Sequence, residues 1–265
     1  MDKNALERIY SKYNRFCYIH PDPLEFVYRY EDPLDRELAG FIASTLAYGR
    51  VRQILKSVSV ILDRMGPSPR RYLGCAGGSG IEKTFSDFKH RFTTAAELSA
   101  MLCGLKRVLR RHGSLEACFA GGMAKSDRTV IPALRAFLSE IIESSGGRPM
   151  SLVPSPDKES ACKRMHLYLR WMVRKDEVDP GVWRRMSPAM LVVPLDTHMH
   201  RICRALDLTR RKGASLRTAL EITEAFSYIV PEDPVRYDFS LTRAPIRGEK
   251  DPVDVLRQKI SPEAA

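Results

Sequence analysis

The chain has 265 residues, and its 43 lysines and arginines exceed its 32 aspartates and glutamates, which leaves a formal charge of +11. This length suits one large domain or two interleaved lobes, and the charge favours a polyanionic partner, above all nucleic acid. No apolar run has the length of a bilayer span and the N-terminus has no signal-peptide core, so we expect a cytoplasmic protein without membrane contact.

The six cysteines are scattered and form no C-x-x-C pair, so they suggest neither a zinc site nor a disulfide framework. No cysteine follows Cys203, which excludes a four-cysteine iron–sulfur loop near the C-terminus. We therefore expect ordinary thiols, with no cofactor and no metal.

Apolar residues recur at helical spacing through most of the chain, which predicts a mainly α fold. Tyr48-Gly49-Arg50 separate the first two apolar stripes, and Thr94 with Glu97 has the pattern of a capping box before the third. The stripes cover residues 38–46, 51–62, 98–109, 134–142 and 216–226.

Dense proline and serine near residue 150 predict an irregular connection between helical blocks. Ser155 has the place of an N-cap and Pro156 that of the first helical residue, so we expect a helix from there to about Arg174. Lys163, Arg170 and Arg174 share one face of this helix.

Asp196 follows an apolar run and precedes Met199 and Ile202, which recur at helical spacing. It therefore has the place of an N-cap, where one carboxylate oxygen accepts backbone N–H groups and the other faces whatever lies beyond the helix end. An N-cap that only starts a helix has the same pattern.

Lys163 and Asp196 each lie near the expected start of a helix that follows a proline-containing turn. A lysine attacks only when deprotonated, which a partly desolvated site beside Arg164 and Arg170 promotes. A carboxylate facing that lysine stabilises a cationic transition state, so the pair suits displacement at a sugar anomeric carbon. The alternative is a surface lysine on a basic helix and an unrelated helix cap.

Residues 194–201, Pro-Leu-Asp-Thr-His-Met-His-Arg, resemble the V-D-T-H-x-x-R signature of the helix-hairpin-helix DNA glycosylase superfamily, which includes endonuclease III and 8-oxoguanine glycosylases. Residues 155–163 stand where those enzymes carry the hairpin and its catalytic lysine. The separation of Lys163 and Asp196 along the chain is more similar to that in the archaeal 8-oxoguanine enzymes than to that in endonuclease III. The resemblance implies Lys163 as the Schiff-base nucleophile and Asp196 as the catalytic aspartate. The whole chain most resembles an uncharacterised bacterial family, domain of unknown function 2400.

The resemblance implies a two-lobed, glycosylase-like helical fold with a central cleft. We expect residues 1–30 and 196–265 in one lobe, residues 31–195 with the hairpin in the other, and a loosely ordered tail over residues 247–265. The implied partner is double-stranded DNA with a damaged base, held by basic and aromatic side chains that contact phosphates or enter the duplex. These candidates are Arg164, Arg170, Arg174, Lys106, Arg110, Tyr48 and Arg50.

The leading hypothesis is a DNA base-excision glycosylase, with or without AP-lyase activity, that acts through a Schiff base at Lys163. The alternative is a catalytically silent nucleic-acid-binding protein of the same fold, favoured by Glu159 and Ala161 at the two glycine positions of the superfamily hairpin. A metal hydrolase built on Asp196, His198 and His200 is a third hypothesis, although residues two apart on a helix point about 200° apart.

Overall fold

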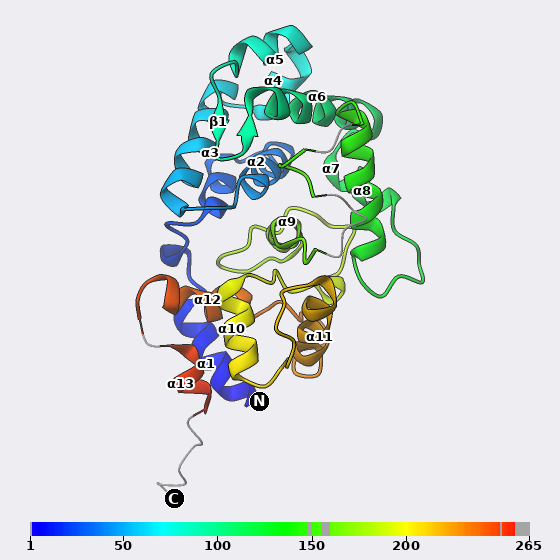
Figure 1. The fold of residues 1–265 in the computed structure, drawn as a ribbon. Helices are drawn as coiled ribbons and strands as arrows, with labels where there is room; N and C mark the ends of the chain where they lie inside the picture. The colour runs from blue at the N-terminus through cyan, green and yellow to red at the C-terminus, as the bar shows by residue number, and fades with distance from the viewer. Residues whose placement is uncertain (1, 148–149, 155–159, 250, 258–265) are drawn as a thin grey trace, which may run out of the picture.

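The computed structural model describes residues 2–147, 150–154, 160–249 and 251–257. The described chain is mainly helical, as expected, with one small antiparallel hairpin (Figure 1). The α-helices are α1 (Lys3–Tyr13), α2 (Pro33–Thr45), α3 (Val51–Met65), α4 (Pro69–Cys75), α5 (Gly78–Thr84), α6 (Ala95–His112), α7 (Leu115–Gly121), α8 (Ile131–Ser144), α9 (Lys163–Val173), α10 (Thr197–Ala205), α11 (Leu216–Ser227), α12 (Asp238–Ile246) and α13 (Pro252–Arg257). The 3₁₀ helices are η1 (Phe16–Tyr18), η2 (Pro23–Arg29) and η3 (Pro188–Met190), and the strands are β1 (Lys89–His90) and β2 (Thr93–Thr94).

All five apolar stripes lie in helices, and the capping box before α6 is present, since Thr94 and Glu97 satisfy each other's backbone N–H groups. The turn at Tyr48-Gly49-Arg50 also separates α2 from α3 as expected. Most of these segments follow the sequence pattern because the helix buries one apolar face and exposes the other, whereas residues 37–45 of α2 are all buried.

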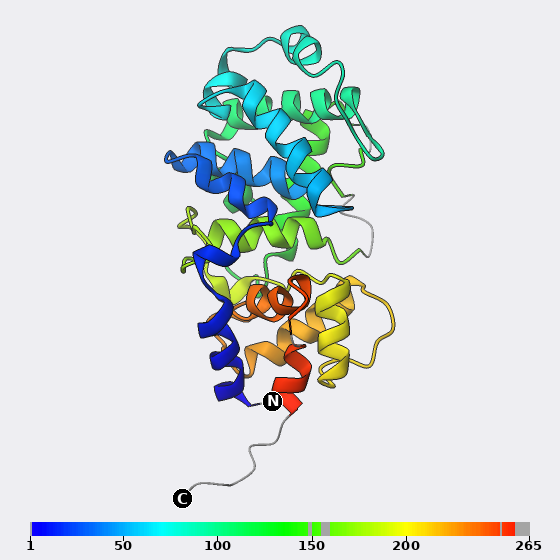
Figure 2. The ribbon, with the colours of Figure 1, turned by 90° about the vertical axis from the view of Figure 1, so that its left-hand side faces the viewer.

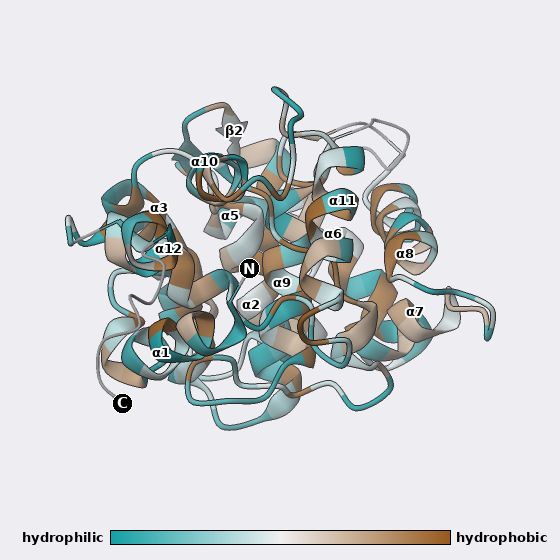
Figure 3. Ribbon diagram, turned by 90° about the horizontal axis from the view of Figure 1, so that it is seen from below, coloured by the Kyte–Doolittle hydropathy of each residue, from teal (hydrophilic) through white to brown (hydrophobic). Residues whose placement is uncertain are grey.

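Helix α9 lies in the middle of the molecule and packs against α2 (Figures 1 and 3). The ring centroid of Tyr168 on α9 is 5.3 Å from that of Phe41 on α2 and 5.3 Å from that of Trp183. Most residues of α9 are buried, so this helix has almost no solvated face. Its charged side chains must therefore find partners inside the protein.

The first and last helices of the described chain lie together, because α1 packs against α12 and α13, and α10 packs against α12 (Figure 2). The 3₁₀ helix η2, which belongs to the segment expected to share a lobe with residues 196–265, packs against α2 and α3. The expected division at residues 30 and 195 stays a prediction.

The helix expected from Ser155 begins at Lys163. Ser155 and Pro156 lie outside the described residues, whereas Ser160 forms an isolated antiparallel bridge with Ser215. Cys162, the N-cap of α9, has a φ of 42°, in the left-handed region. A helix cannot run through this backbone, so the lysine stands at the first helical position.

The tail expected to be loosely ordered, residues 247–265, contains helix α13, which packs against α1 and α10. The last part of that tail, residues 258–265, lies outside the described residues. Within the described ranges, none of the helices has both the length and the apolar character needed to cross a membrane.

Candidate active site

A cavity of about 630 Å³ lies where the α2–α3 turn, the starts of α9 and α10, and one face of α12 meet. Such a volume is typical of sites that enclose a small organic group. Lys163 and Asp196 both line this cavity, although they are far apart in the sequence.

Asp196 is the N-cap of α10, as expected from the sequence. Its Oδ1 accepts the backbone N–H of Met199 at 2.7 Å, and its Oδ2 lies 3.4 Å from the Nζ of Lys163. The side chain of Asp196 is 19% exposed and that of Lys163 is 36% exposed. The pair is therefore partly desolvated yet reachable from the cavity.

The approach to Asp196 is an extended, buried run of residues 191–195. The backbone N–H of Val193 donates to the Oγ1 of Thr223 at 3.0 Å, which ties this run to α11. Met199 and Ile202 bury the inner face of α10. The segments before and after Asp196 are thus both anchored to the protein, which fixes the position of its carboxylate.

Arg164 and Tyr48 also line the cavity, but their polar atoms are bonded to the protein. The Arg164 guanidinium donates to the carbonyls of Thr45 and, at 2.9 Å, Ser151, and its central carbon lies 5.1 Å from the centroid of the Tyr48 ring. The Tyr48 hydroxyl lies 3.0 Å from the carbonyl of His90. Both side chains join wall segments together, and burial lowers the pKa of Arg164.

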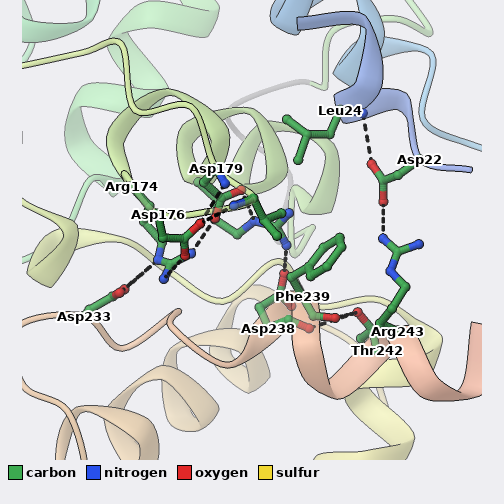
Figure 4. Close-up of polar contacts among 12 residues, drawn as sticks. Asp22, Leu24, Arg174, Asp176, Asp179, Asp233, Asp238, Phe239, Thr242 and Arg243 are labelled. Carbon is green, nitrogen blue, oxygen red and sulfur yellow. Dashed lines mark hydrogen bonds and ion pairs between the residues drawn. The ribbon is translucent and has the colours of Figure 1, made fainter. Parts of the chain in front are cut away.

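Arg170 and Arg174 differ from the expected phosphate contacts, because they are only 2% and 3% exposed. Arg170 Nε lies 3.2 Å from the carboxylate of Asp179, and Arg170 also pairs with Asp238. Arg174 pairs with Asp179 and, at 2.9 Å, with Asp233 (Figure 4). The structure thus uses these arginines to neutralise buried aspartates, since α9 is enclosed on nearly every side.

Asp238 links this ionic network to the cavity, which it lines. Burial and, to a smaller extent, the charge of Asp196 raise the pKa of its carboxyl to about 6, although Arg170 acts to lower it. Asp238 is therefore a carboxyl at the cavity wall with a raised pKa.

Lys106, Arg110 and Arg50 do not line the cavity. The Nζ of Lys106 donates to the carbonyls of Gly74 at 3.2 Å and Ala76 at 2.6 Å, which satisfies the C-terminal end of α4. Arg110, in the last turn of α6, and Arg50, the N-cap of α3, are exposed. Their contact with nucleic acid stays a prediction.

The sequence interpretation missed Asp22, Phe239 and Arg243 in the cavity wall. The clue available in the sequence was the four-residue spacing of Phe239 and Arg243, which share one face if the segment is helical. That face of α12 lines the cavity.

His198 lines the cavity, but the Nε2 of His200 lies 3.0 Å from the carbonyl of Arg211, in the loop after α10. In the part of the chain that the structure describes, no three His, Cys, Asp or Glu side chains gather as metal ligands do. The metal-hydrolase hypothesis thus lacks a ligand set among those residues.

The sequence model of a family described as "Protein of unknown function (DUF2400)" matches residues 22–247. Neither the curated proteins nor the solved structures include a match to this chain. Any further functional conclusion therefore rests on the residues and on the cavity that they line.

Proposed function

The chain belongs to the DUF2400 family, and from the geometry of its cavity we propose that it is a DNA base-excision glycosylase that acts through a lysine Schiff base. The observation that carries the proposal is the 3.4 Å approach of Lys163 Nζ to Asp196 Oδ2 at the wall of a cavity of about 630 Å³. An amine and a carboxylate in contact beside such a space suit covalent catalysis on one extruded nucleotide.

In the proposed reaction, the ammonium of Lys163 first gives a proton to the Oδ2 of Asp196. The free amine then bonds to C1′ of the extruded nucleotide while the glycosidic bond breaks, and the base leaves with that electron pair. The amine transfers a proton to O4′ as the C1′–O4′ bond opens, which leaves a protonated imine between Nζ and C1′. The departing base takes up the proton held by Asp196, which restores the carboxylate beside the positive charge of the imine, where it stabilises that charge.

The arrangement of the surface supports a duplex partner. The β1–β2 hairpin, the start of α3, and α10 lie on one face, toward the viewer in Figure 1 and along the right-hand edge in Figure 2. The starts of α3 and α10 border the cavity through Val51 and Thr197. A duplex lying on this face would bring a nucleotide to the cavity while basic side chains contact its phosphates.

The test is borohydride trapping on duplexes that carry an abasic site, an oxidised base or a deaminated base. We expect the wild-type protein to form a covalent product and Lys163→Ala to form none. Lys175→Ala is the matched control, because Lys175 is exposed and does not line the cavity. Equal product from wild type and Lys163→Ala, or none from either, refutes the lysine's role.

The catalytically silent nucleic-acid-binding protein is the second candidate. The observation that favours it is the burial of Ala161 at one hairpin glycine position, where its methyl group keeps a phosphate from the backbone. Glu159, at the other position, lies outside the described residues. Salt-sensitive duplex binding without trapping on any of the three substrates would favour this candidate over the enzyme.

A further inference from the structure

We infer that the α12 side of the cavity selects the base, and that it selects bases whose exposed edge carries carbonyl oxygens in place of amino groups. The inference rests on the proposed glycosylase function and concerns the substrate of the same site. Its basis is a set of buried arginine N–H groups beside the cavity that have no acceptor among the described residues.

Arg243 is the main member of this set. It lines the cavity, is only 1% exposed, and donates from Nη2 to the Oδ2 of Asp22 at 2.9 Å (Figure 4). Its guanidinium carbon lies 4.2 Å from the centroid of the Phe239 ring, which fixes the plane of the group. Its Nε and Nη1 are buried and have no hydrogen-bond partner in the described ranges.

Arg170 adds a third donor. It also lines the cavity, and its Nη2 is buried with no partner among the described residues, although its Nε and Nη1 are paired. An unsatisfied buried N–H of a charged group is costly and rare in folded proteins. Three of them beside one cavity indicate that an acceptor belongs there.

The carboxylates on this wall already accept hydrogen bonds from the protein. The Oδ1 of Asp22 accepts the backbone N–H of Leu24 at 3.0 Å, and its Oδ2 accepts from Arg243. Asp238 accepts from Arg170, and the Thr242 hydroxyl donates to the Asp238 carbonyl at 2.9 Å. The unsatisfied groups are thus donors, which complement carbonyl oxygens and repel amino groups.

The experiment compares bases that differ by one carbonyl or amino group. Duplexes carry uracil or cytosine, or hypoxanthine or adenine, each opposite a base-free tetrahydrofuran residue so that base pairing does not differ within a pair. Single-turnover base release is measured for each duplex, and borohydride trapping on a pre-formed abasic site reports Lys163 chemistry without a base. We expect the carbonyl member of each pair to be released about 10- to 100-fold faster.

Arg243→Lys is the informative variant, because it keeps a positive charge near Asp22 but removes the Nε and Nη1 donors. We expect it to lose the preference within each pair, and trapping of the abasic site by the same variant reports whether Lys163 chemistry is retained. Arg243→Met should behave in the same way if it folds. The control is Arg247→Met, one turn further on, where the side chain is exposed, pairs with Glu249 and does not line the cavity.

The outcomes separate the two levels of the proposal. If wild type traps the abasic site but releases none of the four bases, or shows no preference within the pairs, the inference is overturned and the lysine chemistry stands. The inference is likewise overturned if Arg243→Lys keeps the preference. If wild type traps no abasic site, the proposed function fails, and the inference fails with it.

Discussion

Asp196 uses its two carboxylate oxygens differently, which allows its structural and chemical roles to be separated. Oδ1 caps α10 and Oδ2 faces Lys163. Asp196→Asn keeps a capping oxygen but removes the charge, so we expect trapping at abasic sites to slow by about 100-fold or more with little change in melting temperature. Asp196→Ala removes both the capping oxygen and the charge, so it should also cost about 1 kcal/mol of stability.

The measurements are the single-turnover trapping rate and the thermal unfolding midpoint of both variants. Ser215→Ala, which removes the N-cap of α11, is the matched control for capping alone. If Asp196→Asn traps at the wild-type rate, the carboxylate is only a helix cap, and the interpretation of a lone N-cap is correct.

The buried imidazole of His166 should make the stability of the protein depend on pH. Both of its ring nitrogens are buried without a partner in the described part of the chain, and complete burial lowers its pKa from 6.5 to about 4. Below pH 6.5 the unfolded chain therefore binds a proton that the folded protein excludes, so stability falls as the pH falls toward 4. The full effect is roughly 3 kcal/mol.

The check is the free energy of unfolding of wild type and His166→Leu across this pH range. The variant should lose less stability on acidification than wild type does. His20→Gln is the matched control, because it removes a histidine whose side chain is 76% exposed. Parallel curves for wild type and His166→Leu would contradict the assignment of this slope to His166.

At the scale of helices, alanine substitutions at two glycines should change stability in opposite directions. Gly104 lies where α6 meets α8, and a Cβ there would clash with the Ser145 side chain and stand 3.0 Å from the Ser145 backbone nitrogen. Gly74 lies in α4, and a Cβ there would meet nothing within 4 Å. We expect Gly104→Ala to destabilise by about 1–3 kcal/mol and Gly74→Ala to stabilise by about 0.5–1 kcal/mol.

Thermal or urea unfolding measures the change in stability of the two variants, and each variant serves as the control for the other. A stabilised Gly104→Ala would mean that α8 shifts to make room, and the close approach of the two helices would then not be a constraint on the fold.

Most of the helices that were predictable from sequence have one buried face, although α2, which was also predicted, is buried throughout residues 37–45. Residues 51–62 and 98–109 show an apolar stripe because α3 and α6 lie at the surface. Helix α12 shows none because residues 238–244 are all buried, so no contrast between faces exists in its sequence. The hairpin was missed because its strands are too short for alternation to be visible.

The difference between local and long-range contacts explains which residues of the candidate site could be predicted from sequence. Asp196 was placed correctly because capping is local and its partner, the Met199 backbone, is three residues away. Arg170 and Arg174 were expected to contact phosphates because charge is normally accessible, whereas their partners Asp179, Asp233 and Asp238 come from later turns and helices. Long-range pairing of buried charges leaves no local pattern in a sequence.

For the whole molecule, the buried ionic network connects the central helix α9 to the end of the molecule where α1, α12 and α13 pack together. Asp179 is fully buried between Arg170 and Arg174, and Asp238 joins Arg170 to α12. Removing one partner leaves buried charge uncompensated, so we expect Asp179→Ala to destabilise by about 3–5 kcal/mol.

Chemical denaturation of Asp179→Ala measures this loss. The control is Glu221→Ala, whose carboxylate pairs with Arg211 at a surface site and should change stability little. If the two variants lose equal stability, the buried network is not what joins α9 to the α12 end of the molecule.

The net charge of +11 predicts duplex binding that weakens steeply as salt is added, because each phosphate contact releases bound counterions. Arg50 stands at the start of α3, on the face shared with the hairpin and α10, whereas Arg110 is in the last turn of α6. Helix α6 follows the hairpin directly, and Arg110 is about 22 Å along it by the helical rise.

We therefore expect Arg50→Ala to reduce the slope of log affinity against log salt by about 1, and Arg110→Ala to leave it unchanged. The measurement is fluorescence anisotropy on an undamaged duplex at several salt concentrations, which needs no catalysis and so holds for the silent-binder candidate as well. If both variants reduce the slope equally, the duplex extends along α6 to its last turn, as the basic pattern of that helix suggests. If neither does, phosphates bind elsewhere, and the face shared by α3, the hairpin and α10 is not the docking surface.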